Sequence, residues 1–421
     1  MLRKNRSFST PSLRNVRSMK SFSFLRSAFI FALVFQAGLQ FVTRAADAKL
    51  ADVPARMWQF VSNATVSGAV TLVAKGGKVL QLEAVGFSDL AANKPMKADD
   101  LFWIASMTKP ITGAAVLMLQ DEGKLSVDDP VEKYLPEFKG QWLVSERTKE
   151  TLTLKRPSRP ITLRDLLTHT SGLGSLDSPR PNATLAELVM GYSQLTLQSE
   201  PGTKWSYNNP GINTLGRVVE LVSGKPFAVF LEERLLKPLA MKDTTFWPTP
   251  AQAQRIAKSY QPGPDNKGLA ETDVYFLRGL PVTDRTRTPT PAGGLFSTAA
   301  DIAKFYQMML NGGEANGRRY LSAEAVKQLT TTQTGDIKTG FTTGMSWGFG
   351  FQVVKEPQGV TAVLAPGTFG HGGAYGTQSW ADPKSGAIYI LMIQRARMAN
   401  GDGSVIRQAF QEAAAAALDV K

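Results

Sequence analysis

The sequence predicts an α+β fold, in which an antiparallel sheet flanked by helices is interrupted by a mainly helical domain. Strand patterns separated by turn signals occur near both ends of the chain, over residues 70–82 and 376–393. The stretch between them has mostly helical patterns broken by polar loops. We therefore expect a sheet domain in two parts, residues 46–134 and 286–421, with the helical domain at 135–285.

The first 45 residues have the features of a targeting segment. Seven basic residues precede an apolar run from Ala28 to Val42, and small residues follow at Ala45 and Ala46. This run is short for a membrane span and contains two glutamines. We expect a signal peptide over residues 1–45 that is cleaved, so that the protein is secreted or periplasmic and keeps no stable membrane span. An uncleaved membrane anchor is the alternative.

The composition excludes several classes of function. The 421 residues contain no cysteine, which excludes disulfides, cysteine nucleophiles and thiolate metal sites. His169 and His371 are the two histidines of the sequence, so we expect no metal centre and no cofactor. Cleavage after Ala45 would remove eight basic residues and no acidic one, lowering the formal charge from +13 to +5. A nucleic-acid partner therefore has little support.

The first part of the sheet domain begins with residues 49–62, which have the spacing of an amphipathic helix. Two strands, Val70–Ala74 and Val79–Leu82, flank a Lys-Gly-Gly-Lys turn, which predicts a hairpin. A buried helix should then begin at Ser106 and end ahead of Gly123.

The later elements follow from the same signals. Residues 161–173 predict an N-capped helix that ends at a glycine. Further helices are expected at 185–190, 212–222, 227–236, 298–310 and 405–418. Residues 347–354 are strand-like, and 376–380 with 388–393 should form a hairpin.

Ser106 and Lys109 form the first chemical motif, Ser106-Met107-Thr108-Lys109. Residues three apart share one face of a helix, so Lys109 would stand beside Ser106. A serine hydroxyl becomes a nucleophile when a neutral lysine removes its proton, and free N–H groups at a helix start favour a developing oxyanion. The motif is short, and serine is also a common N-cap residue, so it needs support from other motifs.

Tyr207-Asn208-Asn209 is the second motif. A tyrosine can relay protons to a leaving group, and an amide two residues later can donate to a substrate carbonyl and hold a lysine ammonium. The neighbouring pairs Pro201-Gly202 and Pro210-Gly211 also fit an ordinary turn.

The third motif is His371-Gly372-Gly373, followed by Ala374. Glycines let a strand edge approach a ligand closely, and a backbone N–H just after them could form half of an oxyanion hole with that of Ser106. A glycine-rich bulge or hairpin is the purely structural alternative.

The three motifs, in this order in a chain with a signal sequence, resemble those of the serine β-lactamase and penicillin-binding-protein superfamily. The match is closest to the class C β-lactamase-like branch, which includes family VIII carboxylesterases and D-amino-acid peptidases. The flanks at residues 166–173 and 293–301 resemble that branch as well. The resemblance covers nearly all of the mature chain.

This resemblance implies a β-lactamase/transpeptidase-like sheet domain and a helical domain with the site between them. It implies that Ser106 is the acyl-accepting nucleophile and that Lys109 and Tyr207 are the acid/base pair. Asn209 would be a substrate and lysine anchor. The backbone N–H groups of Ser106 and Ala374 would form the oxyanion hole.

The chain departs from the family pattern at the third motif. Penicillin-recognising members carry Lys-Thr/Ser-Gly where this chain has His371-Gly372-Gly373, which we expect to contact substrate. Because a histidine is mostly neutral at pH 7, neutral esters should be preferred over anionic substrates. Binding of carboxylates, β-lactams included, should then improve as the pH falls from about 8 towards 6.

Other matches compete with these motifs. Lys338-Thr339-Gly340 is a literal Lys-Thr-Gly, but its polar surroundings predict a loop. Gly344–Gly348 matches the G-x-S-x-G nucleophile elbow around Ser346, yet that elbow needs a following helix and a strand pattern follows here. His169, at a leucine-rich helix end, should be structural.

We expect a secreted serine hydrolase that acts through an acyl-enzyme on a small ester or amide, with an esterase ahead of a β-lactamase or D-Ala-D-Ala-type carboxypeptidase. A non-catalytic binding or sensor module on the same fold is an alternative, although binding would not require Ser106, Lys109, Tyr207 and Asn209 together. An envelope scaffold would depend on an uncleaved signal anchor. The sequence leaves the oligomeric state open.

Overall fold

An eight-stranded antiparallel sheet carries the fold, in the order β12-β13-β14-β15-β16-β1-β2-β3. The computed structural model describes residues 49–176 and 180–419, and the expected signal peptide lies outside them. The strands come from both ends of the described chain, which confirms the expected α+β class. They are β1 (Gly68–Lys75), β2 (Lys78–Asp89), β3 (Lys94–Pro95), β12 (Met345–Trp347), β13 (Gln352–Val354), β14 (Phe369–Gly372), β15 (Gln378–Asp382) and β16 (Ala387–Met392).

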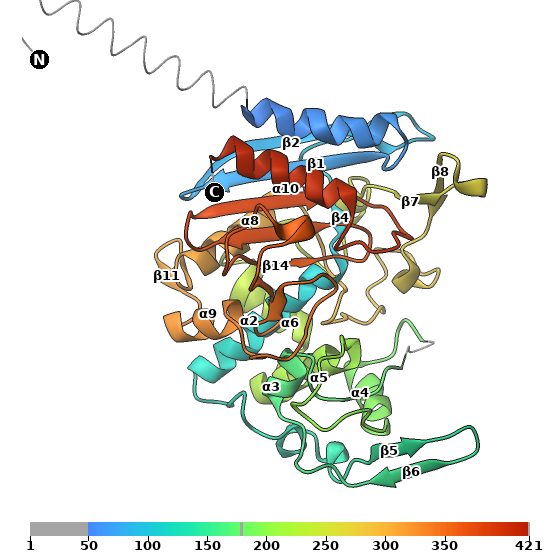
Figure 1. Cartoon of the computed structure of the whole chain (residues 1–421), viewed down its shortest axis with the longest axis vertical. Coiled ribbons are helices and arrows are strands. Elements are labelled where there is room, and N and C mark those ends of the chain that lie inside the picture. Colours follow the sequence, from blue (N-terminus) through green and yellow to red (C-terminus); the bar gives the residue numbers. More distant parts are fainter. Residues whose placement is uncertain (1–48, 177–179, 420–421) are drawn as a thin grey trace, which may run out of the picture. The chain divides into compact units, whose positions relative to one another are not determined.

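Both faces of the central strands are buried. Successive residues of a strand point to opposite faces, so Leu72 of β1 joins one hydrophobic core and Val73 joins the other. The helix over residues 49–62 and α10 (Val405–Ala417) cover one face (Figure 1). On the other face, α8 (Ala299–Leu310) packs against β1 and β16. The sheet is therefore a rigid support for the loops at its ends.

The helix that follows Ser106, α2 (Thr108–Asp121), is buried along nearly its whole length. Its residues from Gly113 to Leu119 are apolar and buried, as expected for a helix inside a core. The expectation that Ser106 opens this helix is wrong by two residues, because Ser106 lies in a separate 3₁₀ turn, Ala105–Met107. Lys109 consequently occupies the first turn of α2.

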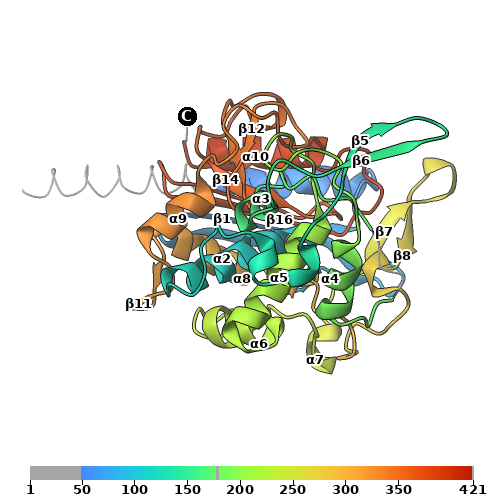
Figure 2. The ribbon, with the colours of Figure 1, turned by 90° about the horizontal axis from the view of Figure 1, so that it is seen from below.

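Helices fill the middle of the chain, as expected. They are α3 (Leu163–Leu167), α4 (Leu185–Ser193), α5 (Asn209–Ser223), α6 (Phe227–Leu231) with a π-helical turn (Glu232–Leu236), α7 (Pro250–Ala253) and, later, α9 (Ala323–Thr330). Helix α5 packs against α2, α3 and α4 (Figure 2). Helix α3 ends at Leu167 rather than near Gly172, because His169 has a φ of +59°, which a right-handed helix cannot contain.

Short paired strands connect these layers. They are β4 (Phe102–Trp103) with β9 (Phe296–Ser297), β5 (Leu143–Arg147) with β6 (Leu152–Lys155), β7 (Ser259–Pro262) with β8 (Leu269–Thr272), and β10 (Glu314–Ala315) with β11 (Arg318–Arg319). The remaining 3₁₀ turns are Val131–Lys133, Pro136–Phe138, Pro264–Asn266, Tyr275–Leu277 and Gly359–Thr361. The single strand expected over 347–354 is wrong, because a turn at residues 348–351 divides it into β12 and β13.

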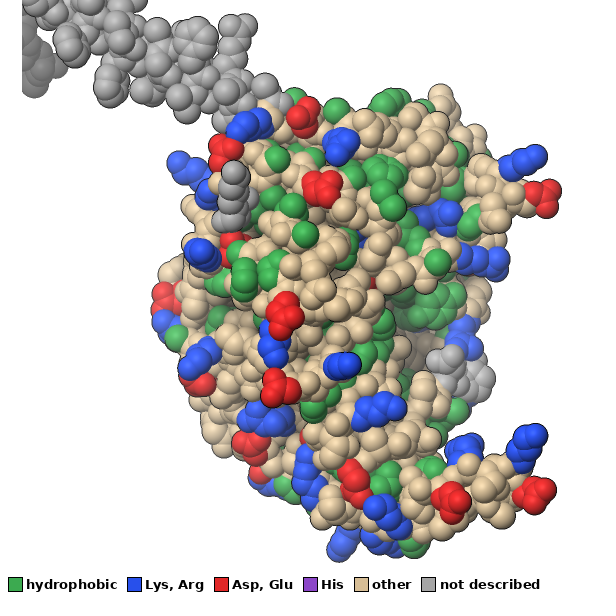
Figure 3. All heavy atoms as spheres, in the orientation of Figure 1, with side chains coloured by type: hydrophobic (Ala, Val, Ile, Leu, Met, Phe, Trp, Pro, Cys, Tyr) green, Lys and Arg blue, Asp and Glu red, His purple; other side chains and the backbone are tan. Residues whose placement is uncertain are grey.

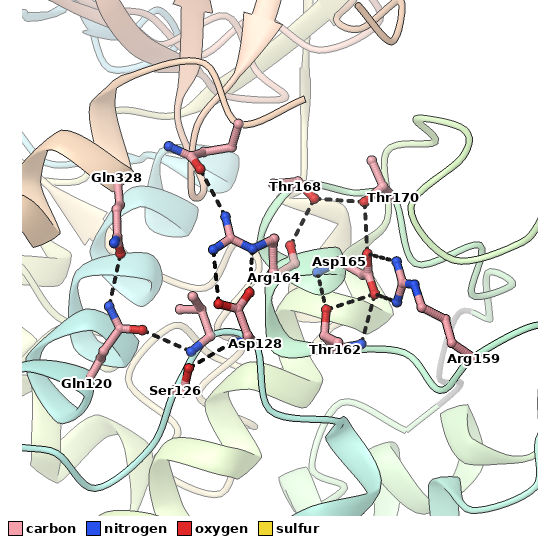
Figure 4. Close-up of polar contacts among 12 residues, drawn as sticks. Gln120, Ser126, Asp128, Arg159, Thr162, Arg164, Asp165, Thr168, Thr170 and Gln328 are labelled. Atoms are coloured by element: carbon pink, nitrogen blue, oxygen red, sulfur yellow. Dashed lines mark hydrogen bonds and ion pairs between the residues drawn. The ribbon is translucent and has the colours of Figure 1, made fainter. Parts of the chain in front are cut away.

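Ion pairs fix the short helix α3 (Figure 4). Asp165 accepts hydrogen bonds from both terminal nitrogens of Arg159, at 2.6 and 2.9 Å, and closes a capping box with Thr162. Arg164 pairs with Asp128 at 2.7 Å. The capping box satisfies N–H groups that the helix start leaves open. These contacts hold the backbone that continues into His169.

The surface carries charges of both signs. On the face drawn in Figure 3, acidic and basic side chains are interspersed. Among the helices of residues 49–176 and 180–419, none combines the length and the apolar character needed to cross a membrane. The described chain belongs to one compact unit. The domain boundaries expected near 135 and 285 stay a prediction.

Candidate active site

Ser106 lies in a constrained turn between β4 and α2. Ala105, just before it, has a φ of +45°, which non-glycine residues rarely adopt. Thr108 holds this turn, because its hydroxyl donates to Ala105 O at 2.7 Å and accepts from Leu295 N–H at 3.3 Å. The strained backbone thus has local support, a pattern common at functional sites.

Lys109 contacts Ser106 in a dry environment. Its Nζ lies 2.9 Å from Ser106 Oγ and donates to Ala292 O at 2.5 Å. The side chain is fully buried, and burial lowers its pKa well below the ordinary 10.5. A neutral amine can donate to Ala292 O and still offer its lone pair to the Ser106 hydroxyl proton. The pair can therefore generate a serine nucleophile.

Tyr207 lies in the loop that leads to α5, with its ring centre 4.7 Å from Lys109 Nζ. Burial raises the pKa of its hydroxyl, and a hydrogen bond with Ser106 partly opposes this shift. The ring packs against His169 at 4.6 Å and Phe341 at 4.9 Å between centroids. A tyrosine that keeps its proton is suited to donate it to a leaving group.

His169 supports the backbone of the loop that carries Tyr207. Its Nδ1 accepts the Asn208 N–H at 3.1 Å, and burial lowers the pKa of the imidazole well below 6.5. The imidazole is therefore neutral and acts as a fixed acceptor. The Asn208 side chain caps α5 by accepting from Gly211 N–H at 2.7 Å. Together these contacts determine where Tyr207 and Asn209 stand.

The predicted site residues lie partly on an open cleft and partly in the interior. Ser106, Asn209 and Ala374 line one cleft, which is open to solvent. Asn209 begins α5 and is exposed. The lysine amine is held by Ala292 O, and an anchoring role for Asn209 stays a prediction. His371-Gly372-Gly373 is fully buried at the end of β14.

The pH dependence that we expected from His371 is wrong. Its side chain is only 1% exposed, and its Nδ1 lies 2.7 Å from Gly372 O. Burial is the main cause that lowers the pKa of His371 to about 3. The imidazole therefore stays neutral between about pH 6 and 8. It cannot attract a carboxylate more strongly as the solution becomes mildly acidic.

Sequence patterns did not indicate an aromatic rim on the same cleft, formed by Trp103, Tyr275 and Phe276. The Trp103 ring stacks on Phe276 at 5.4 Å and meets Tyr275 edge-on at 5.4 Å. Its Nε1 donates to Gly293 O at 2.7 Å, which fixes the ring. Trp103 lies three residues before Ser106 and could have been suspected, whereas no sequence signal marks Tyr275 and Phe276.

Two arginines also line this cleft, Arg180 and Arg278. Both are exposed, and Arg278 ends the short 3₁₀ turn that carries Tyr275 and Phe276. These two arginines bring positive charge to the cleft. The lysine that penicillin-recognising family members carry in the third motif is replaced here by His371. No sequence signal marked them, because isolated arginines are common on surfaces.

The competing motifs do not form a site of the type their patterns require. Ser346 lies in β12, is buried, and has its hydroxyl 3.1 Å from that of Thr334. Strand β13, and not a helix, follows it, so the nucleophile elbow is excluded. Lys338 is exposed in a loop ahead of β12, as expected.

A serine hydrogen-bonded to a buried lysine, at a cleft bordered by an antiparallel sheet and helices, defines the class of serine β-lactamases and penicillin-binding proteins. A family model described as Beta-lactamase matches residues 47–414. The chain belongs to this family.

Proteins similar to this chain include an esterase and a penicillin-binding protein. Protein Rv1367c of Mycobacterium tuberculosis is 34% identical over 354 residues, covering 78% of this chain and 86% of that protein. Esterase EstB of Burkholderia gladioli is 29% identical over 364 residues, with coverage of 78% and 86%. Penicillin-binding protein 4 of Amycolatopsis lactamdurans is 30% identical over 335 residues, with coverage of 78% and 80%.

Solved structures share the fold. The hydrolase EstCE1 superposes with a TM-score of 0.72 at 22% identity, covering 89% of this chain and 99% of that chain. The simvastatin synthase LovD of Aspergillus terreus, in its unliganded selenomethionyl form, superposes with a TM-score of 0.73 at 20% identity, with coverage of 87% and 98%.

Proposed function

We propose that this protein is an exported serine hydrolase that cleaves a small ester or amide through an acyl-enzyme, with an esterase-like preference. The observation that carries the proposal is the contact of 2.9 Å between Ser106 Oγ and the Nζ of the buried Lys109. Within residues 49–176 and 180–419 no acidic group contributes to the pKa of Lys109, so the buried amine is suited to act as a base. A binding module would have no use for it.

The proposed reaction follows from the positions of these groups. Lys109 takes the Ser106 proton as Oγ attacks the substrate carbonyl, and the backbone N–H groups of Ser106 and Ala374 receive the oxyanion. Tyr207 passes its proton to the departing oxygen or nitrogen and takes one back from the nearby Lys109 ammonium, so both groups return to their starting forms. In deacylation, water gives a proton to Lys109 as it attacks the acyl carbon, and a proton returns to Ser106 Oγ as the carboxylic acid leaves.

Three observations support an ester as substrate. The neutral His371 offers no fixed cation at the third motif. The rim of Trp103, Tyr275 and Phe276 gives the cleft an aromatic wall that suits an apolar acyl or alcohol group. Esterase EstB is among the relatives that match most of the chain.

The alternative is a β-lactamase or D-Ala-D-Ala-type carboxypeptidase. Arg180 and Arg278 favour it, because a guanidinium can bind the carboxylate of such substrates. The likeness to penicillin-binding protein 4 of Amycolatopsis lactamdurans supports the same reading. Both functions use the same Ser106 acyl-enzyme and differ in the group that the cleft accepts.

The test uses the mature protein with a panel of p-nitrophenyl esters, nitrocefin and an acyl-D-Ala-D-Ala peptide. We expect the esters to be cleaved fastest and Ser106→Ala to remove the activity. Ser346→Ala is the matched control and should keep it. A fluorophosphonate should label the peptide that contains Ser106, and labelling at Ser346 or no turnover of any substrate would contradict the proposal.

A further inference from the structure

The turn over Gly373–Thr377 connects β14 to β15 and carries the proposed second oxyanion donor. Gly373 N–H donates to Thr377 O at 2.7 Å, and Gly376 N–H donates to Gly373 O at 3.0 Å. Ala374 lies at its exposed apex and lines the cleft. Among the described residues, no hydrogen-bond partner takes the Ala374 N–H. The turn therefore presents this group to a ligand.

A buried guanidinium fills the inner side of the turn. Arg407, from α10, is 1% exposed. Its Nη2 donates to Thr377 O at 2.7 Å and to Gly373 O at 3.2 Å, and its Nε donates to Gly376 O at 3.3 Å. Its Nη1 forms an ion pair with Asp402. The planar fork of an arginine can hold several carbonyls at fixed angles, which a lysine cannot do.

We propose that Arg407 is a positioning residue of the oxyanion hole, which orients and polarises the peptide group between Gly373 and Ala374. This inference rests on the proposed function. The Gly373 carbonyl and the Ala374 N–H belong to one planar peptide unit, in which they point in opposite directions. Because the carbonyl faces the buried Arg407, the N–H is turned toward the cleft.

The positive charge of Arg407 also makes the Ala374 N–H a stronger hydrogen-bond donor. A hydrogen bond from a cation to a carbonyl draws electron density along the peptide and makes its N–H a better donor. Stabilisation of an oxyanion depends on donors that are fixed before the reaction begins. Arg407 acts through Ala374 N–H and does not contact the substrate.

The glycines of the third motif make this arrangement possible. A Cβ on Gly372 would lie 2.4 Å from Asp402 Oδ1 and 2.7 Å from Arg407 Nη1. A Cβ on Gly373 would lie 2.6 Å from Ile104 O. Both glycines are therefore needed for the backbone to approach the ion pair on one side and the Ser106 segment on the other.

One further contact joins the two halves of the oxyanion hole. The Thr377 hydroxyl donates to Ile104 O at 3.4 Å, two residues before Ser106. The guanidinium of Arg407 binds the carbonyl of that same threonine. The Ser106 and Ala374 N–H groups are thus held in one frame by Arg407 and Thr377.

The test compares binding of an oxyanion mimic with binding of a neutral ligand in the mature enzyme. The probes are an alkyl trifluoromethyl ketone, whose serine adduct carries an oxyanion, and the methyl ketone of the same chain. In Arg407→Met we expect kcat for p-nitrophenyl butyrate and affinity for the fluoroketone to fall about tenfold or more, in parallel. KM and methyl-ketone affinity should change less than about threefold.

Two further variants keep the result interpretable. Asp402→Asn leaves the cation in place but removes its partner, so it should fold and show a smaller loss of the same kind. Arg407→Lys should recover only part of the lost kcat, because one ammonium cannot span three carbonyls. Arg395→Met is the matched control, since its guanidinium donates to Thr65 O and Ala396 O rather than to carbonyls of the turn. It should keep fluoroketone affinity.

The outcomes separate the two proposals. If folded Asp402→Asn and Arg407→Lys keep wild-type kcat and fluoroketone affinity, Arg407 is only structural and the inference is overturned. Equal losses for both ketones would overturn it too, because they would indicate general damage to the cleft. Failure of the wild type to acylate Ser106 at all would instead contradict the proposed function.

Discussion

Lys109 Nζ lies 4.7 Å from the centre of the Tyr207 ring, and the pKa values of the two groups move in opposite directions. Burial lowers the pKa of the lysine and raises that of the tyrosine, because in each case it disfavours the charged form. The lysine amine is thus neutral and the tyrosine hydroxyl keeps its proton. We propose that these two groups take the base and acid roles that acyl transfer requires.

The first prediction concerns Lys109→Arg. An arginine cannot lose its proton near neutral pH, so acylation should fall by about a hundredfold or more. In the wild type, kcat/KM should be flat above the depressed pKa of Lys109 and should fall as the pH drops through it. Stopped-flow acylation with p-nitrophenyl butyrate measures both. Lys338→Arg should behave like the wild type, and an active Lys109→Arg enzyme would mean that another group takes the proton.

The second prediction concerns Tyr207→Phe. Loss of the hydroxyl removes the proton donor for the leaving group, so cleavage of an alkyl ester should fall about a hundredfold. A p-nitrophenyl ester should be affected much less, because nitrophenolate leaves without a proton. The ratio of kcat/KM for the two esters measures the effect, with the exposed neighbour Ser206→Ala as control. Equal losses on both esters would remove Tyr207 from this role.

The third prediction concerns Arg278→Ala. If Arg180 and Arg278 bind an anionic group, Arg278→Ala should raise KM for an ester with a free carboxylate about two- to fivefold, as expected for an exposed charge. KM for a neutral ester of the same size should not change, and the effect should disappear in about 1 M salt. Lys338→Ala is the control for a cation outside the cleft. An equal rise for both esters would indicate a shape effect instead.

The fourth prediction concerns stability in acid. The pKa of His371 is about 3 in the native state, against an ordinary value of 6.5. Between these values the unfolded chain binds the extra proton, so the free energy of unfolding falls as the pH drops from 6.5 towards 3. His371→Asn should show a shallower decline between about pH 7 and 5 in urea titrations. A decline as steep as that of the wild type would contradict the buried, neutral histidine.

Local patterns predicted several of the helices and strands and the contact between Ser106 and Lys109. The Lys75–Lys78 turn, the N-cap at Thr162 and the uninterrupted apolar run of α2 are short-range signals, and each produced the expected element. The spacing of Ser106 and Lys109 placed both on one face, as the contact of 2.9 Å confirms. Two predicted elements differ from the structure at single points. The helix expected over 161–173 ends before His169, and the strand expected over 347–354 is divided by the turn between β12 and β13.

The sequence by itself determined the order of the elements, the Ser106–Lys109 pair and the family, because these depend on neighbours along the chain. Only the tertiary structure decided which groups titrate and which face the cleft. Nothing near His371 in the sequence indicates that its side chain is buried beside Lys109 and Arg407. Those partners lie 262 and 36 residues away in the numbering, and burial by distant segments sets both a pKa and the direction in which a peptide N–H points.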